Sequence, residues 1–127
     1  MTVEPLSERA DDFIQRNAER LIVSDFAAAE FASAIARRVR TRETTLEDAR
    51  KDLADFDVWT ARLTERTELN AGDVAAATAY MRRLDLTLLT PDALRIAIAR
   101  RLGATLVTFD RQMRAAARAL GMAVATP

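Results

Sequence analysis

Residues 90–111 read TPDALRIAIARRLGATLVTFDR, and this stretch contains the pattern that decides the fold. Thr90, Pro91 and Asp92 together are typical of a helix start, with a capping hydroxyl, a proline at the first helical position and an acid in the first turn. The predicted helix ends at Gly103, because glycine favours the position just after a helix. Beyond this glycine the helical pattern of apolar residues ends.

Residues 104–109 are mostly apolar or β-branched and predict a strand, and residues 110–120 predict a helix that Gly121 ends. The alternation continues outward in both directions. The other expected elements are a helix at 7–20, a strand at 21–24, a helix at 25–40, a long helix from 45, a short strand at 67–69, a helix at 71–84 and a strand at 122–125. This alternation predicts a parallel sheet covered by helices on both faces, an α/β three-layer fold.

Two hydroxyl residues are the predicted caps of the earlier helices. Ser24 precedes the helix at 25–40, and Thr45 opens the long helix with Asp48 three residues on, an approximate capping box. The helical period of the long helix predicts an inward face made of Leu46, Ala49, Leu53, Phe56, Trp59 and Leu63.

The composition excludes several kinds of chemistry. The 127 residues, half of them hydrophobic, are enough for one folded domain, and they include no Cys and no His. Thiolate nucleophiles, disulfides, Cys-based zinc sites and the usual general base are therefore absent. Any catalysis has to use carboxylates, hydroxyls, Arg and the backbone, which favours a hard divalent cation held by oxygen ligands.

The charge pattern is less specific. The formal net charge is zero, and Lys51 is the only lysine among 19 basic residues. Arginine matches phosphate geometry, but a compositional bias of the genome explains the same usage more simply. The first residues include several acids, and no apolar run approaches the roughly 18 residues of a membrane helix. We therefore expect a cytoplasmic protein without a membrane segment.

Glu30 is the first candidate site residue, because it is the only charge between Phe26 and Ala36. A helix this apolar is packed on most sides, and a buried carboxylate needs a partner or a metal. The alternative is a narrow exposed stripe that Glu30 shares with Ser33 and Arg37. The helix alone leaves both interpretations open.

Asp110 and Asp92 are the other candidates. Asp110 directly follows the strand at 104–109, and the carboxyl ends of parallel strands are where ligands bind in this architecture. Taken alone, Asp110 is more simply explained as the N-cap of the next helix. Asp92 can simply complement the dipole of its own helix. Thr108 lies on the same side of the strand as Asp110 and is a candidate for orienting a ligand, or an ordinary strand threonine.

These acids become informative together. Glu30 and Asp92 each lie near the start of a helix, and Asp110 ends a strand, so similar orientation of the three elements would bring the carboxylates to one edge of the sheet. Clustered acids raise one another's pKa unless a cation neutralises them. The pattern therefore predicts a divalent metal site.

Three segments in this order resemble a known family. They are LIVSDFAAAEFASA at 21–34, TPDALRIAIA at 90–99 and GATLVTFDR at 103–111. They are similar to PIN domains and, more narrowly, to the VapC-type toxins of bacterial and archaeal toxin–antitoxin pairs. The resemblance places Glu30, Asp92 and Asp110 at the family's acidic positions, whereas Arg95 stands where many relatives carry His.

One family motif has no counterpart in the sequence. PIN domains of this type begin with a strand that runs into a catalytic Asp, and Asp11 and Asp12 lie on a predicted helix instead. We therefore expect residues 1–127 to form a single PIN-like domain that is truncated at its N-terminus. A start codon assigned too far downstream, a degenerate gene copy and an element exchanged from another chain are the three explanations. The first is favoured, because the remaining motifs are intact.

The resemblance implies a metal-dependent endoribonuclease that uses Mg²⁺ or Mn²⁺, with Glu30, Asp92 and Asp110 as ligands. It also implies a VapB-like antitoxin partner and a homodimer. The alternative, favoured by the missing Asp, is a catalytically impaired module that binds antitoxin or RNA without cleavage.

Further residues are candidates for partner binding. Arg111, Arg114 and Arg118 share one helix face and could follow an RNA backbone; solvated surface arginines are the simpler interpretation. A second arginine cluster, with the same two interpretations, comprises Arg37, Arg38, Arg40 and Arg42. Trp59, with Phe56 and Leu63, either packs in the core or lines a groove for an antitoxin helix, as in relatives.

Overall fold

The computed structural model describes residues 21–108 and 110–126, which form parts of two compact units. We call residues 21–68 the hairpin unit, and residues 69–108 with 110–126 the C-terminal unit. The helix expected at 7–20, with Asp11 and Asp12, lies outside the described residues.

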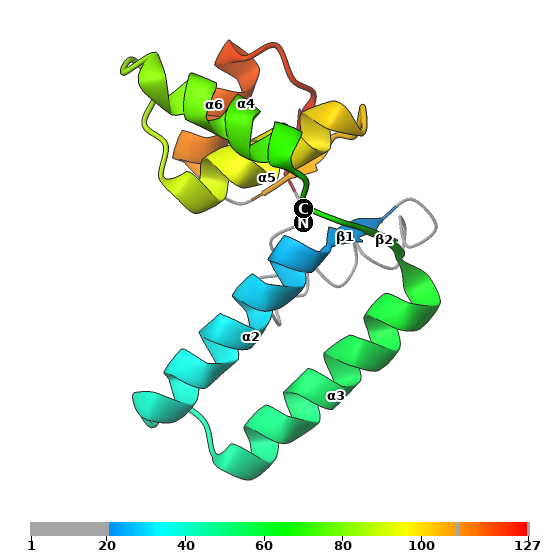
Figure 1. Ribbon diagram of the computed structural model, residues 1–127. Coiled ribbons are helices and arrows are strands. Elements are labelled where there is room, and N and C mark those ends of the chain that lie inside the picture. The colour runs from blue at the N-terminus through cyan, green and yellow to red at the C-terminus, as the bar shows by residue number, and fades with distance from the viewer. Residues whose placement is uncertain (1–20, 109, 127) are drawn as a thin grey trace. The chain divides into compact units, whose positions relative to one another are not determined.

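The hairpin unit consists of two antiparallel helices framed by two short strands (Figure 1). The strands pair in parallel, with Ile22 opposite Glu65 and Ser24 opposite Thr67. In chain order the elements are β1 (Ile22–Ser24), α2 (Asp25–Arg40), α3 (Leu46–Leu63) and β2 (Glu65–Thr67). The second strand therefore lies two residues earlier than the sequence predicted.

Both predicted caps of this unit are confirmed. Ser24 Oγ accepts a hydrogen bond from the backbone N–H of Ala27 at 2.9 Å. Thr45 Oγ1 accepts one from the N–H of Asp48 at 3.1 Å. Each bond satisfies a donor that a helix start would otherwise leave without a partner, so the local sequence fixes where α2 and α3 begin.

Aromatic packing joins the two helices of the hairpin. The rings of Phe31 and Phe56 stack with centroids 4.1 Å apart, and Trp59 lies 6.0 Å from Phe56 in a tilted arrangement. The predicted inward face of α3 is wrong at both ends, because Leu46 is 54% exposed and Leu63 is 50% exposed. These leucines are the first and last residues of α3, which at 18 residues is longer than the 16-residue α2 beside it.

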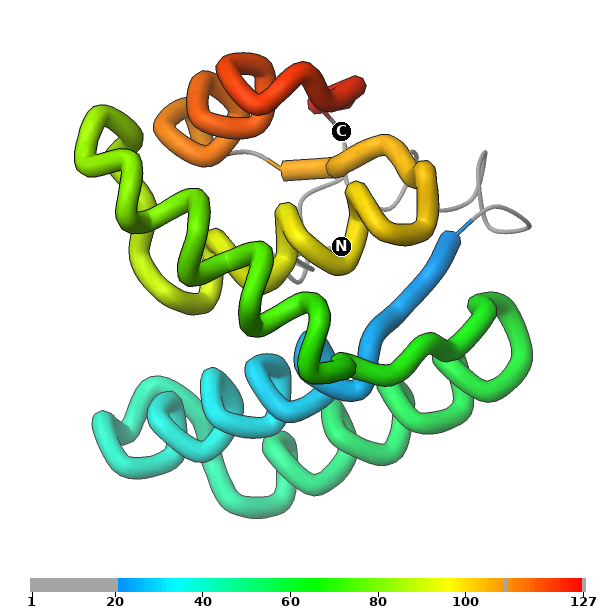
Figure 2. Tube along the Cα trace, turned by 45° about the horizontal axis from the view of Figure 1, so that its top comes forward, coloured from blue at the N-terminus to red at the C-terminus, as the bar shows by residue number. Residues whose placement is uncertain are grey.

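The C-terminal unit alternates helices with two very short strands, as Figure 2 shows from α4 in green to α6 in orange. Leu106 pairs with Val124 and Val107 with Ala125, again in parallel. The elements are α4 (Ala71–Arg82), α5 (Thr90–Arg101), β3 (Leu106–Val107), α6 (Arg111–Ala119) and β4 (Val124–Ala125).

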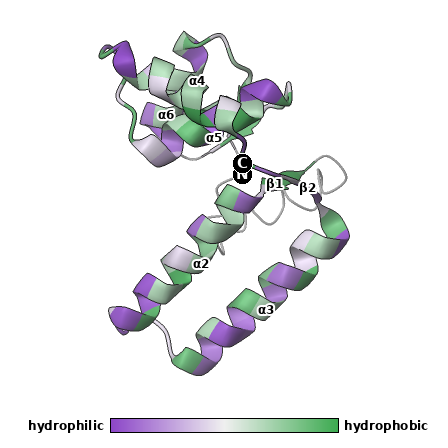
Figure 3. Cartoon of the chain, in the orientation of Figure 1, coloured by the Kyte–Doolittle hydropathy of each residue, from purple (hydrophilic) through white to green (hydrophobic). Residues whose placement is uncertain are grey.

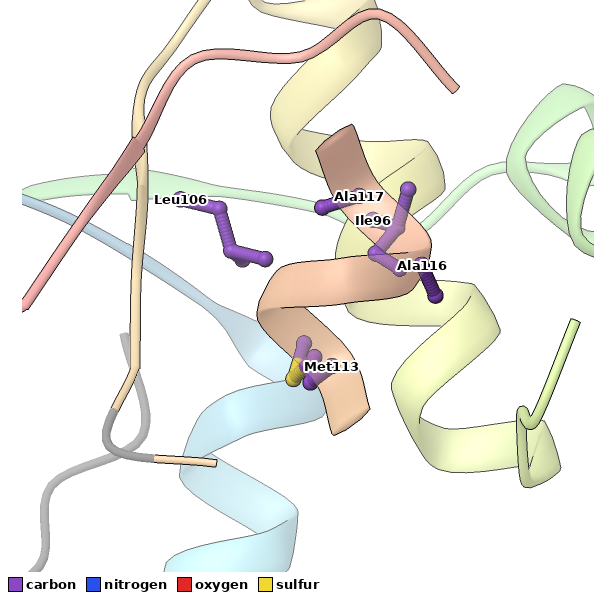
Figure 4. Close-up of a cluster of buried hydrophobic side chains, with 5 residues drawn as sticks. All are labelled: Ile96, Leu106, Met113, Ala116 and Ala117. Atoms are coloured by element: carbon purple, nitrogen blue, oxygen red, sulfur yellow. The ribbon is translucent and has the colours of Figure 1, made fainter. Parts of the chain in front are cut away.

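Its core is a cluster of buried side chains from α5, β3 and α6 (Figure 4). The helices contribute Ile96, Met113, Ala116 and Ala117, and the strand contributes Leu106. The small alanines let α6 approach the strand closely, while Met113 reaches from the first turn of α6 toward α5.

In this unit the predicted helix ends are confirmed, whereas the predicted N-cap of α5 is wrong. Gly103 and Gly121 have φ values of 62° and 80°, which confirms both as helix-ending residues. Thr90 is the first residue of α5 and not its cap; the N-cap position belongs to Leu89, which forms no side-chain cap. The hydroxyl of Thr90 instead donates to Met81 Sδ at 3.7 Å.

Both strand pairs are parallel, which confirms the α/β fold class. Among the described residues, each unit holds one two-stranded pair. No helix in the described part of the chain is long and apolar enough to cross a membrane.

Candidate functional site

Asp110 is the N-cap of α6 and lies three residues beyond Val107, where β3 ends. The observed strand is thus shorter than the one expected at 104–109. Asp110 Oδ1 accepts hydrogen bonds from the backbone N–H groups of Gln112 at 2.8 Å and Met113 at 3.2 Å. The capping interpretation is therefore confirmed. Within the described residues, neither of these bonds ends on Oδ2, and the residue is exposed. Oδ1 therefore holds the start of the helix, and Oδ2 takes part in neither of these two bonds.

Thr108 fixes the backbone that carries this carboxylate. It is 2% exposed, and its Oγ1 accepts a hydrogen bond from the N–H of Asp110 at 3.1 Å. Its carbonyl oxygen accepts one from Arg114 Nη1 at 3.2 Å. Arg114 therefore uses a donor to anchor the end of β3, which distinguishes it from the exposed residues Arg111 and Arg118 on the same helix.

Asp92 lies in the first turn of α5 and forms an ion pair with Arg95 in the same helix. The distance between Arg95 Nη1 and Asp92 Oδ1 is 3.8 Å, and the two side chains are 18% and 20% exposed. This pair was not predicted from the sequence, although the i, i+3 spacing is one at which opposite charges meet on a helix.

Met113 connects these two acidic residues. Its backbone N–H donates to Asp110 Oδ1, and its Sδ accepts a hydrogen bond from Arg95 Nη1 at 4.0 Å. Asp92 and Asp110 are therefore linked indirectly, by contacts of Asp92 with Arg95, of Arg95 with Met113 and of Met113 with Asp110. This chain of contacts brings the first turn of α5 and the N-cap of α6 to one region of the C-terminal unit.

Glu30 lies in the second turn of α2 and is half-buried. It belongs to the hairpin unit, whereas Asp92 and Asp110 belong to the C-terminal unit, so its convergence with them stays a prediction. Among the described residues, no group of three or more Asp, Glu, His or Cys side chains is placed to hold a metal ion.

A buried acid that was not predicted from the sequence is Asp73 in the first turn of α4. It is 2% exposed, and its carboxylate accepts hydrogen bonds from Arg101 Nε at 2.8 Å and Arg101 Nη2 at 3.0 Å. The N–H of Asn70 donates to Asp73 Oδ2 at 3.0 Å, and Asn70 Oδ1 accepts from the N–H of Asp73 at 3.0 Å.

Arg101, and then the Asn70 N–H, lower the pKa of the Asp73 carboxyl despite its burial. The Asn-x-x-Asp spacing of a capping box was the available sequence signal. Because helix and arginine donors already satisfy this carboxylate, it serves the fold and not a ligand.

The arginines at the end of α2 differ in their surroundings. Arg37, Arg40 and Arg42 are exposed, whereas Arg38 is half-buried and lies 3.9 Å from Glu43. Figure 3 shows this end of α2 as hydrophilic. Their contact with RNA stays a prediction.

Comparison with known proteins places this geometry in a family. The PIN domain model matches residues 2–119. A solved structure, VapBC2 from Rickettsia felis bound to a DNA fragment from their promoter, is similar with a TM-score of 0.71 at 14% identity, over 94% of this chain and 86% of that one. Comparison with curated proteins gives no match. Because the family model spans most of the sequence, this chain belongs to the PIN domain family.

Proposed function

We propose that this chain is a metal-dependent endoribonuclease and the toxin of a type II toxin–antitoxin pair, with residues 1–127 acting as one PIN domain. The observation that carries the proposal is the divided carboxylate of Asp110. Its Oδ1 caps α6, and its Oδ2 takes part in neither capping bond. Contacts through Met113 and Arg95 link Asp110 to Asp92. PIN domains are generally nucleases, so this family membership supports phosphodiester cleavage.

The donor chemistry of the site fits Mg²⁺ or Mn²⁺. Asp92 and Asp110 offer oxygen ligands, and Mg²⁺ commonly binds one or two carboxylates while keeping several waters. Glu30 is a further proposed ligand, on the resemblance to VapC-type toxins. A bound cation would supply activation of water and stabilisation of charge on the phosphate. Thr108 orients the site, because its hydroxyl fixes the backbone from which the Asp110 side chain extends.

Two surfaces are assigned to macromolecular partners. Arg111 and Arg118 are exposed on α6, the helix that Asp110 caps, and we assign them to the RNA backbone. A VapB-like antitoxin would bind α3, where Val58 and Leu63 are both about half exposed. The similar Rickettsia felis structure contains a VapBC complex, which supports such a partner. We further assign the chain to a homodimer in the cytoplasm, in line with its resemblance to VapC-type toxins.

Cleavage of structured RNA tests the proposal directly. The full-length protein should cut RNA in Mg²⁺ or Mn²⁺, and Asp110→Asn and Asp92→Asn should each lower the rate by two orders of magnitude or more. Asp57→Asn is the matched control, because Asp57 is an exposed acid on α3 that is not among the proposed site residues. Cleavage by Asp92→Asn at the rate of the Asp57→Asn control would contradict the assignment.

A second candidate is an RNA-binding or antitoxin-binding domain that does not cut. The ion pair between Arg95 and Asp92 favours it, since Asp92 already has a cationic neighbour. In that case calorimetry would detect RNA or antitoxin binding but no binding of Mn²⁺.

A further inference from the structure

Arg95 lies directly beside the proposed metal ligand Asp92, although the proposed cleavage reaction gives it no role. Its guanidinium is 3.8 Å from Asp92 Oδ1, and four-fifths of each side chain is buried. We infer that Arg95 is a built-in counter-ion of Asp92 that opposes metal binding, and that an RNA phosphate relieves this opposition. The inference rests on the proposed function, because it takes Asp92 to be a metal ligand.

The opposition results from charge and burial. A guanidinium stays protonated at every pH at which a protein folds, so Arg95 always places a positive charge beside Asp92. The field of a partly buried charge is screened less by water and salt than that of an exposed one. Arg95 therefore repels any divalent cation that Asp92 binds. The guanidinium also neutralises part of the negative charge with which Asp92 would attract that cation.

The position of Arg95 also explains how RNA could relieve this effect. Arg95 Nη1 donates to Met113 Sδ, and Met113 N–H donates to Asp110 Oδ1. The guanidinium that pairs with Asp92 therefore also contacts the residue bonded to Asp110. A scissile phosphate bound at the proposed ligands Asp92 and Asp110 would come within reach of the guanidinium. The planar fork of arginine matches phosphate oxygens, and the bound phosphate would neutralise its charge. Metal and RNA should consequently bind cooperatively.

Manganese titration by calorimetry tests the first half. In the absence of RNA, Arg95→Gln should bind Mn²⁺ about tenfold more tightly than the natural protein, the lower end of the effect that one neighbouring cation has on the cation affinity of a carboxylate. Arg95→Lys should stay close to the natural protein, because it keeps the charge. Arg100→Gln, an exposed arginine on the same helix, is the control and should change nothing.

A 2′-O-methylated RNA oligonucleotide, which is not cleaved, tests the second half. This RNA should strengthen Mn²⁺ binding to the natural protein and have little effect on Arg95→Gln. Equal Mn²⁺ affinity in the natural protein and Arg95→Gln overturns the inference but leaves the proposed nuclease intact. Tighter Mn²⁺ binding in Arg95→Lys as well would show that the shape of the side chain and not its charge controls the affinity, which would also overturn the inference. Absence of Mn²⁺ binding in all variants overturns both proposals.

Discussion

Arg101 at the end of α5 and Asp73 at the start of α4 form a two-point ion pair, with N···O distances of 2.8 and 3.0 Å. The two residues are 28 positions apart in the sequence, so this contact joins two separate helices. Asp73 also completes the capping box with Asn70, so the same carboxylate starts α4 and attaches it to α5.

Replacing Asp73 with Ala should lower the free energy of unfolding by about 2 kcal/mol, because the cap and the bonds from Arg101 are lost together. Chemical denaturation with urea measures the change. Asp57→Ala, an exposed acid within α3, should stay within about 0.5 kcal/mol of the natural protein. A loss of the same size in both variants would show that the ion pair has no special importance.

The pH dependence of this contribution has a definite sign. The pKa of Asp73 is lowered in the folded state, chiefly by Arg101, relative to an unfolded value of about 3.9. Its stabilisation is therefore present above the unfolded pKa and is lost as the pH falls through the folded one. The difference in unfolding free energy between the natural protein and Asp73→Asn should be constant from pH 7 to about pH 5 and shrink below about pH 4. A difference that grows with acidification would contradict this assignment.

Substitutions of Asp110 should separate folding from metal binding. Asp110→Asn keeps an oxygen that can accept from Gln112 and Met113, so thermal stability should change little while Mn²⁺ binding weakens. Asp110→Ala loses the cap as well and should cost about 1 kcal/mol of stability. Thermal unfolding and calorimetry of both variants give the comparison. Unchanged Mn²⁺ affinity in both would remove Asp110 from the proposed site.

Thr108 offers a similar matched pair. Thr108→Val keeps the shape but leaves the N–H of Asp110 without its acceptor, which should cost about 1–2 kcal/mol and reduce RNA cleavage. Thr108→Ser keeps the hydroxyl and should retain most of the activity. If valine and serine variants cleave RNA equally well, the hydroxyl does not position the site.

The sequence predicted the features that local chemistry determines. Ser24, Thr45 and Asp110 cap helices through bonds to residues two or three positions away, so a short window contains all the necessary information. The same applies to Gly103 and Gly121, where a positive φ ends each helix.

The errors and omissions concern contacts between distant segments. Thr90 was predicted as a cap, but its hydroxyl donates to Met81 on another helix. The strand predicted at 67–69 lies at Glu65–Thr67, because its register is set by pairing with β1. The partner of Asp73 is 28 residues away, and no local pattern identifies it. Convergence of Glu30 with the other acids is a question of the same long-range kind.

The parallel pairing of β1 with β2 has a consequence for the order of folding. Ile22 meets Glu65 across the whole of α2 and α3, and closing so long a loop in an unstructured chain is entropically unfavourable. Formation of the two antiparallel helices and the stacking of Phe31 on Phe56 lower this entropic cost, because they bring Glu65 near Ile22 before the strands pair. The strands are therefore expected to pair last, as a late product of the hairpin and not as its nucleus.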